Sequence, residues 1–243
     1  MKKVVSIIVC KNIAEIPTEP EAAEILYTEE NRGFAEIVQN ALKQAKGKYV
    51  LLCDGGFELA NADGLLSVAG ASNADIIVFD GATALKTTLF KGFAPNGDRA
   101  TAEILAVLAA KSIEKSNIKP FVFANEREAD KYLYSEQTEK ELANALREFK
   151  KCKSRLPKDV YTYAVDIICL RLTYYYAAAM LAVKSKAIPL SALTDFDALL
   201  RENVVLYLAM DKRFTPANLG KLRKNGFAIS FLTAKKFEKF LRK

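Results

Sequence analysis

Residues 24–59 read EILYTEENRGFAEIVQNALKQAKGKYVLLCDGGFEL, and this stretch decides the fold. Residues 24–28 are a short strand-like segment, and residues 31–33 (Asn-Arg-Gly) are a turn signal. The apolar residues of 34–46 recur at helical spacing, and residues 49–53 form a continuous apolar run typical of a buried strand. A strand, a helix and a second strand with short connections predict an α/β fold with a parallel sheet.

The same alternation continues on both sides of this stretch. Residues 4–10 form a β-branched run that predicts a buried first strand, and residues 74–79 predict another strand. Residues 100–111 have the pattern of an apolar helix, and residues 120–124 that of a short strand. We therefore expect a mostly parallel, Rossmann-type sheet flanked by helices, and Gly47 is expected as the C-cap glycine of the helix at 34–46.

The C-terminal part has a different pattern. Residues 139–184 have helical spacing with a break near Pro157, and residues 189–202 predict a short helix. The last elements are expected as a strand, a helix, a strand and a helix, at residues 204–210, 216–224, 227–233 and 234–243. We expect two domains, an α/β domain at 1–138 and a basic, mainly helical domain at 139–243.

The composition excludes several kinds of chemistry. The 243 residues include 36 basic and 29 acidic residues, a net charge of +7, and no histidine. The absence of histidine excludes Ser-His-Asp and Cys-His catalysis and histidine-ligated zinc. Any general base must therefore be a carboxylate or, less readily, a Lys, Tyr or Cys side chain. The four cysteines are scattered without a CxxC pair, and we expect them to be reduced and mostly buried.

The positive charge lies in the second part of the chain. Residues 1–100 carry 10 basic and 13 acidic residues, and the remainder carries 26 and 16. The tail at 235–243, KKFEKFLRK, suits an amphipathic helix that either packs on the domain or lies on a membrane surface. No nucleic-acid recognition motif accompanies the basic residues, so no nucleic-acid partner is expected. The N-terminal apolar run has no cleavage-site pattern, and we expect a cytoplasmic protein that associates with a membrane through its basic part.

Residues 24–59 resemble the family 2 glycosyltransferases of the GT-A fold. That family shows an N-x-G-F/x-A turn, a helix that ends in A-x-G-x-Y, and a strand that runs into D-x-D. The matching positions here are Asn31, Gly33, Phe34, Ala35, Ala45, Gly47, Tyr49 and Asp54. The opening VVSIIVCKN is similar to the family's first strand, with Ser6 and Asn12 in place and the proline lost.

A second stretch is similar to the acceptor half of the same family. Residues 74–110 match a strand and a loop that lead to an acidic pair opening a helix, and Asn96-Gly97-Asp98 occupies the position of that pair. Residues 121–137 match the strand that follows. The resemblance covers residues 1–138 and implies sugar transfer from a nucleotide-sugar donor to a polysaccharide or lipid-linked acceptor.

The resemblance also implies roles for individual residues. Asp98 would be the base that takes the proton of the acceptor hydroxyl, and a divalent cation, Mn²⁺ or Mg²⁺, would neutralise the diphosphate. Asn12 and Asp54 would contact the donor, and Asp54 would hold the metal, with Glu58 as the candidate to replace the family's second acid. Asp80 is a further candidate donor contact, because it ends a strand at the carboxyl edge of the sheet. Each residue has a structural alternative, since Asp98 suits a helix N-cap and Asp54 a turn.

Two departures from the family affect the donor side. Gly56 replaces the second acid of D-x-D, and a glycine offers no side-chain oxygen to a metal. Only eleven residues separate Asn12 from Glu24, too few for a complete crossover and the strand that it would lead to. Two classes of function therefore stay open: a divergent, inverting glycosyltransferase, and a catalytically inactive binding or assembly module with the same fold.

Overall fold

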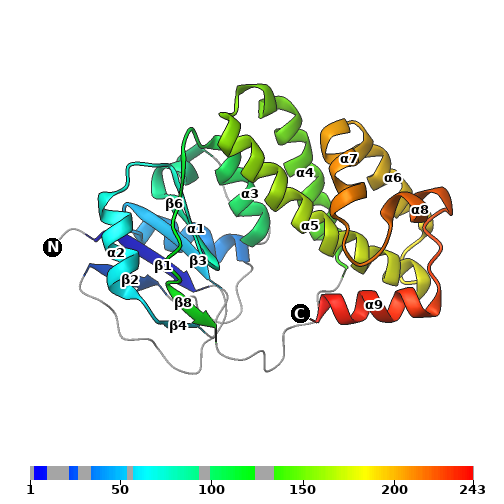
Figure 1. Cartoon of the computed structure of the whole chain (residues 1–243), viewed down its shortest axis with the longest axis horizontal. Helices are drawn as coiled ribbons and strands as arrows, with labels where there is room; N and C mark the ends of the chain where they lie inside the picture. The colour runs from blue at the N-terminus through cyan, green and yellow to red at the C-terminus, as the bar shows by residue number, and fades with distance from the viewer. Residues whose placement is uncertain are drawn as a thin grey trace. The chain divides into compact units, whose positions relative to one another are not determined.

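The computed structural model describes residues 3–9, 22–26, 34–53, 57–92, 99–123 and 134–242. The chain divides into two compact units. Unit 1 comprises Met1–Glu126 with Arg155–Tyr161, and unit 2 comprises Arg127–Ser154 with Thr162–Lys243. The strands lie in unit 1, and most helices after residue 134 lie in unit 2 (Figure 1). A domain boundary at residue 138 stays a prediction.

Unit 1 is built on a sheet in which, over the described residues, six strands follow the order β2-β1-β3-β6-β5-β7. Strands β1, β2, β3, β5 and β7 run parallel to one another, and β6 runs antiparallel between β3 and β5. This confirms the mostly parallel α/β sheet expected from the sequence. The strands span Val5–Val9 (β1), Ala23–Leu26 (β2), Tyr49–Cys53 (β3), Ile76–Phe79 (β5), Ala82–Lys86 (β6) and Ile113–Lys115 (β7).

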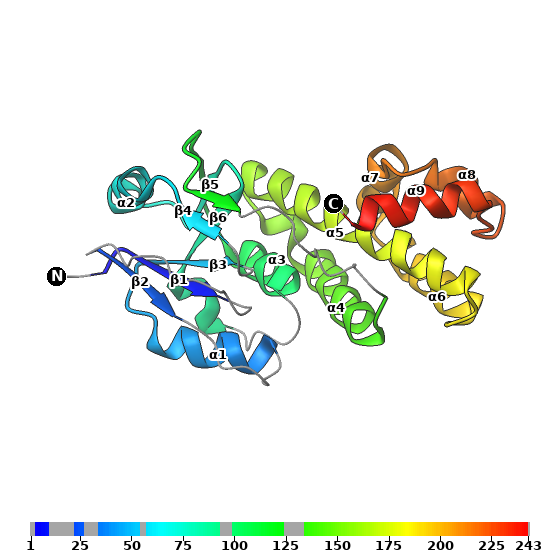
Figure 2. The same cartoon turned by 90° about the horizontal axis from the view of Figure 1, so that it is seen from below.

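Helices cover both faces of this sheet. Helices α1 (Phe34–Gln44) and α3 (Arg99–Ala109) lie on one face, and α2 (Ala62–Ala71) lies on the other (Figure 2). A 3-10 helix, η1 (Thr87–Gly92), follows β6. Strands β4 (Phe57–Leu59) and β8 (Phe121–Phe123) form a separate antiparallel pair. This arrangement is the layered architecture that alternating strands and helices produce.

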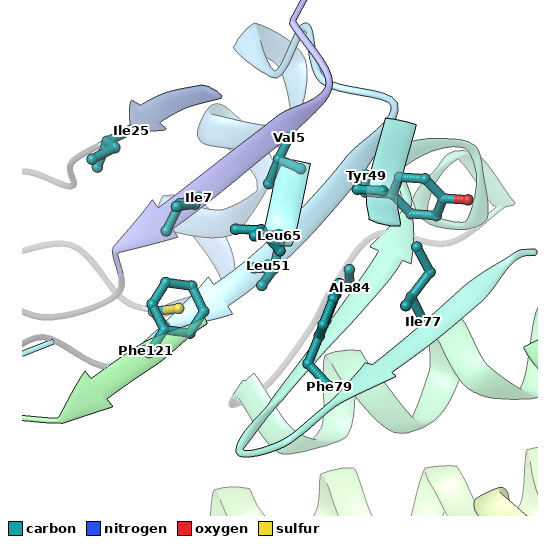
Figure 3. Close-up of a cluster of buried hydrophobic side chains, with 12 residues drawn as sticks. Val5, Ile7, Ile25, Tyr49, Leu51, Leu65, Ile77, Phe79, Ala84 and Phe121 are labelled. Carbon is teal, nitrogen blue, oxygen red and sulfur yellow. The ribbon is translucent and has the colours of Figure 1, made fainter. Parts of the chain in front are cut away.

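The core of unit 1 lies between the sheet and α2. Alternate residues of each strand point to the same face, so Val5, Ile7 and Leu51 are all directed toward Leu65 of α2 (Figure 3). Phe121 of β8 joins this cluster and is 1% exposed, which ties the two-stranded pair to the main sheet. Because the strands are buried on both faces, they read as continuous apolar runs in the sequence.

Gly47 is required by close packing rather than by helix capping. Helix α1 ends at Gln44, and Gly47 does not have the left-handed φ of a C-cap glycine. A Cβ atom at this position would lie 2.5 Å from the backbone nitrogen of Ser6 and 2.6 Å from its Oγ. The Gly47 amide also donates to Ser6 Oγ at 2.8 Å. The glycine is therefore the residue that lets the chain pass directly against β1.

Replacing Gly47 with alanine is expected to destabilise the protein by about 1–3 kcal/mol, because the backbone of β1 cannot move aside freely. Gly70→Ala is the matched control. Gly70 lies in α2 with no atom within 4 Å of an added Cβ, and alanine there should stabilise the helix by about 0.5–1 kcal/mol. Urea denaturation of both variants measures the difference, and equal effects would contradict the close-packing explanation.

Six α-helices of the described residues lie in unit 2, apart from Lys158–Tyr161 at the start of α5, which belongs to unit 1. They are α4 (Glu136–Cys152), α5 (Lys158–Lys184), α6 (Leu190–Arg201), α7 (Val204–Arg213), α8 (Leu219–Lys224) and α9 (Phe231–Leu241), with a 3-10 turn, η2 (Lys153–Arg155), after α4. Helix α5 begins just after Pro157, as the sequence indicates. It is long and apolar enough to cross a membrane, but 67% of its apolar window is buried inside the protein, as in a core helix.

The sequence-based predictions of two strands in the C-terminal part are wrong. Residues 204–210 belong to helix α7, which buries Leu206 and Met210, four residues apart, on one face. Residues 227–233 form no strand, because Phe227 has a left-handed φ of 59° and Ser230 caps the start of α9. A left-handed φ at a bulky residue interrupts an extended chain, and here it lets the buried Phe227 ring stack on Tyr176 at 6.2 Å.

Candidate functional site

The carboxyl edge of the sheet is the candidate site of unit 1. Strands β1, β3 and β5 are parallel, so their last residues, Val9, Cys53 and Phe79, lie at the same edge. Ligands of open α/β sheets bind in the crevice outside the carboxyl ends of the strands. Strands β1 and β3 are direct neighbours, and β6 separates β3 from β5.

Asp80 lies at this edge, in the turn that follows β5. Phe79 pairs with Ala82, so Asp80 and Gly81 form a two-residue hairpin turn, and Gly81 has the left-handed φ of 81° that favours glycine. The Asp80 amide donates to the carbonyl of Ile118 at 3.0 Å. Its side chain is exposed and has no partner among the described residues, which leaves the carboxylate free to meet a ligand.

Glu58 lies in β4, opposite Val122 of β8. Its neighbour Leu59 packs against the core cluster, and successive side chains of a strand point to opposite faces, so Glu58 points away from the core. The side chain is exposed and unpaired within the described part of the chain. Glu58 thus belongs to a different strand pair from β3, the strand that runs into the D-x-D-like segment.

Asn12, Asp54 and Asp98 lie outside the described residues. In the chain, Asn12 follows β1 by three positions and Asp54 directly follows β3. Asp98 directly precedes Arg99, the first residue of α3. Two of the three residues therefore continue from neighbouring strands that end at the carboxyl edge.

A metal site is not made up by the described residues alone. No group of three or more His, Cys, Asp or Glu side chains lies close enough to hold a cation among them. The carboxylates of Asp80 and Glu58 are the kind of oxygen donor that Mg²⁺ and Mn²⁺ prefer, but they come from separate strand pairs.

Glu24, a buried acid, serves the opposite edge of the sheet. It lies near the start of β2, is 8% exposed, and accepts hydrogen bonds from Ser6 Oγ and from the amides of Lys46 and Gly47. These bonds join β2 and β1 to the turn after α1. One oxygen of the carboxylate, Oε1, accepts all three bonds, and no sequence signal marked the residue, because its partners lie 18 to 23 positions away.

Asp75 has a similar structural role just before β5. Its carboxylate contacts Lys86 Nζ at 2.9 Å and accepts from the amide of Lys111 at 2.8 Å. Partial burial raises the pKa of Asp75, but the hydrogen bonds and charges of Lys86 and Lys111 outweigh it, and the net pKa is below the ordinary value. Asp80 thus differs from Asp75 and Glu24 in two ways. It lies at the carboxyl edge of the sheet, and its carboxylate has no partner among the described residues.

Three of the four cysteines lie among the described residues. Cys53 and Cys169 are buried, Cys152 is partly exposed, and all three are free thiols, as the sequence predicts. Burial, the largest influence, raises the pKa of Cys169 to about 11, so its thiol stays protonated near neutral pH. A protonated thiol is a poor nucleophile.

Comparisons with known proteins support the fold. A scan against protein-family models found no match, and a search of curated proteins found no relative. The structure is similar to that of TarS, a glycosyltransferase of S. aureus, with a TM-score of 0.58 and 13% identity over 98% of this chain and 55% of TarS. A structure of TarS 1–349 in complex with UDP-GlcNAc gives a TM-score of 0.55 and 14% identity, and the match covers 98% of this chain and 89% of that one.

The likeness extends over both units, because 98% of the chain is covered in each comparison. The chain spans only about half the length of the longer TarS chain, 55% of it. At this level of identity the comparison establishes the fold, and membership of family 2 stays a prediction. The chain has a GT-A-like glycosyltransferase fold with an attached helical part.

Proposed function

We propose that the chain binds a nucleotide-sugar donor at the carboxyl edge of its sheet and transfers the sugar to an acceptor hydroxyl. The observation that carries this proposal is the sheet itself: β1 and β3 are parallel neighbours that end together, at the edge where such folds bind nucleotides. Its likeness to TarS, which has been crystallised with UDP-GlcNAc, makes a UDP-sugar the first donor to test.

The donor side of the proposal rests on neighbouring strands. Adjacent strands lie about 4.8 Å apart, so the segments that leave Val9 and Cys53 begin close together. We expect Asn12 and Asp54 to contact the donor from these segments. Asp80 follows β5, two strands from β3, and we expect its exposed carboxylate to contact the sugar or ribose side of the donor.

Asp98 is the proposed base. It directly precedes α3, which packs against β6 and η1 in unit 1. In the reaction, the acceptor oxygen forms a bond to the anomeric carbon while the bond from that carbon to the diphosphate oxygen breaks. The acceptor proton passes to the Asp98 carboxylate, and the nucleoside diphosphate leaves. A single displacement of this kind inverts the configuration at the anomeric carbon.

An inactive binding or assembly module is the second candidate, and one sequence feature favours it. Gly56 stands where the family's second D-x-D acid binds metal, and Glu58, the nearest acid that could replace it, belongs to the separate β4–β8 pair. Such a module would keep the fold and bind a sugar polymer or a partner protein without turnover.

The proposed acceptor is a polysaccharide or a lipid-linked saccharide. The net charge of the chain is +7, and its excess of basic residues lies after residue 100. Such an excess attracts acidic polymers and anionic membrane surfaces. A cytoplasmic location at the membrane surface fits such an acceptor.

Thermal unfolding in the presence of UDP- and GDP-sugars, with and without Mn²⁺, tests donor binding. A donor present at one hundred times its dissociation constant should stabilise the folded protein by about 2.7 kcal/mol. We expect a UDP-sugar to raise the unfolding temperature, and product analysis with acceptor fractions then separates the two candidates. Stabilisation without turnover would favour the inactive module, and no shift with any donor would remove the transferase proposal.

A further inference from the structure

Unit 2 contains a pocket of about 850 Å³ that has no role in the proposed sugar transfer. It lies between the start of α4, the end of α5 and helix α9, and α9 runs beside the end of α5 in both views (Figures 1 and 2). A volume of this size falls in the range of about 300–1,000 Å³ that is typical of small-molecule sites. All of its described lining residues belong to unit 2.

The wall of the pocket is mainly aliphatic. It is formed by Ala178, Leu181 and Ala182 of α5, by Ile188 just after that helix, and by Leu241 of α9. Ala178 and Ala182 lie one helical turn apart, so two short side chains on the same face of α5 leave the space open. A wall of this kind favours a saturated hydrocarbon chain over a polar ligand.

A cationic group of residues marks one end of the pocket. The Phe231 ring is 65% exposed, with Lys235 Nζ 4.6 Å and Lys184 Nζ 5.7 Å from its centroid. Neither lysine forms a salt bridge with any described residue. Two like charges are therefore held around one ring at the rim of an apolar cavity, an arrangement that an anion would stabilise.

The pocket also has two acids, and neither forms a salt bridge with Lys184 or Lys235 among the described residues. Glu136 of α4 lies 3.9 Å from Lys140 on its own helix. Glu238 lies on α9, three residues after Lys235 and thus one turn further from Phe231. The lining therefore combines an aliphatic wall with two lysines around Phe231 and two carboxylates.

We propose that this pocket binds an amphiphile that consists of a saturated chain and a terminal phosphate. The chain packs against Ala178, Ala182 and Leu241, and the phosphate lies between the ammonium groups of Lys184 and Lys235. Opposite charge at the rim and apolar contact along the wall together fit this class of ligand better than a free sugar or a free nucleotide. The proposal concerns unit 2 alone and does not depend on donor binding by unit 1.

The full chain can be titrated with decyl and dodecyl phosphate by calorimetry, below the concentrations at which they form micelles. Each added methylene should tighten binding about fourfold, so the dodecyl compound should bind about 15-fold more tightly than the decyl compound. Dodecyltrimethylammonium, with the same chain and a cationic head, should bind about tenfold more weakly or worse than dodecyl phosphate. Absence of binding by either alkyl phosphate, or equal binding of the cationic compound, would overturn the proposal.

Lys235→Glu and Lys236→Glu form a matched pair of variants. They change the net charge equally and lie next to each other on the exposed side of α9, but only Lys235 lines the pocket. We expect Lys235→Glu to weaken binding of dodecyl phosphate about tenfold and Lys236→Glu to leave it within about twofold. Equal losses in the two variants would show a general charge effect and contradict the pocket assignment.

A third variant and a vesicle arm complete the test. Ala182→Phe narrows the cavity from α5 and should abolish the chain-length dependence, with circular dichroism as the check that it is folded. Vesicles of phosphatidylcholine with and without phosphatidylglycerol show whether the bound amphiphile is a membrane lipid or a soluble compound. Binding of monomeric alkyl phosphate without vesicle binding supports a soluble amphiphile, and binding of both supports a membrane lipid. Binding to anionic vesicles alone would assign the lysines to a surface contact and overturn the pocket proposal.

Discussion

Replacing Asp197 with alanine is expected to lower the free energy of unfolding by about 3–5 kcal/mol, because it removes the more buried of the two carboxylates that pair with Arg223. Asp197 is 3% exposed and accepts hydrogen bonds from Tyr176 Oη at 2.6 Å and from Arg223 Nε at 2.8 Å. The Arg223 side chain is 7% exposed. Alanine would remove this buried counter-charge and leave the guanidinium with Asp211, whose side chain is 35% exposed.

The surroundings of Arg223 explain why the loss should be large. Its Nη1 donates to Asp211, its Cζ lies 3.8 Å from the Tyr207 ring centroid, and its Nη2 is buried without a hydrogen-bond partner among the described residues. Burial, the largest influence, and the nearby Asp197 raise the pKa of Tyr176 well above its ordinary value, so its hydroxyl stays protonated and donates. The carboxylate of Asp197 thus joins α5, α6 and α8 through two charged hydrogen bonds.

Urea denaturation measures the effect, with two graded controls. Asp211→Ala removes the second acid at Arg223, but that side chain is 35% exposed, and a loss of about 1 kcal/mol is expected. Tyr176→Phe removes one hydrogen bond from the carboxylate and should cost about 1–2 kcal/mol. An Asp197→Ala variant as stable as Asp211→Ala would contradict the proposed role of this buried pair.

Asp54→Ala is expected to weaken binding of a UDP-sugar by about tenfold to a hundredfold, the range for a lost hydrogen bond to a charged group. Asp54 directly follows β3, which ends beside β1 at the proposed donor edge. Donor affinity is measured by calorimetric titration with Mn²⁺ present.

Asp63→Ala is the matched control for that experiment. It removes the same charge from the same unit, but Asp63 is an exposed residue in the first turn of α2. Donor affinity should not change in this variant by more than about twofold. Equal affinities of wild type, Asp54→Ala and Asp63→Ala would exclude Asp54 as a donor contact.

The central strands could be predicted from the sequence because burial on both faces produces unbroken apolar runs. Strand β3 spans the predicted residues 49–53, and β1 lies within the predicted 4–10. Strands β6 and β7, helix α2 and strand β4 were not predicted. Strand β6 reads ATALK and β7 reads IEK, so neither shows a clear apolar pattern, and tertiary pairing with β5 makes them strands.

The C-terminal errors arose from short apolar runs that suit either a strand or a helix. The run at 204–210, VVLYLAM, is rich in β-branched and aromatic residues, yet it directly follows α6 and packs against it as helix α7. Its exposed Val204 and Leu208 and its buried Leu206 and Met210 have helical spacing, which only the tertiary context distinguishes from a strand.

From the sequence, the candidate site could be predicted only as acidic residues that directly follow predicted strands. Strand ends at 53 and 79 indicated Asp54 and Asp80, and the structure places Asp80 at the carboxyl edge with a free carboxylate. The sequence could not distinguish acids available to a ligand from acids that hold the sheet. Glu24 and Asp75 belong to the second kind, since their partners come from distant parts of the chain.

A crystal structure with a bound UDP-sugar tests the central claim most directly. We expect the diphosphate against the segments that leave β1 and β3, with the Asp54 side chain in contact with the nucleotide or its cation and Asp98 facing the anomeric carbon. A nucleotide bound away from the ends of these strands, for example in the pocket between α5 and α9, would contradict it. A carboxyl edge closed by side chains, with no donor bound at saturating concentration, would contradict it as well.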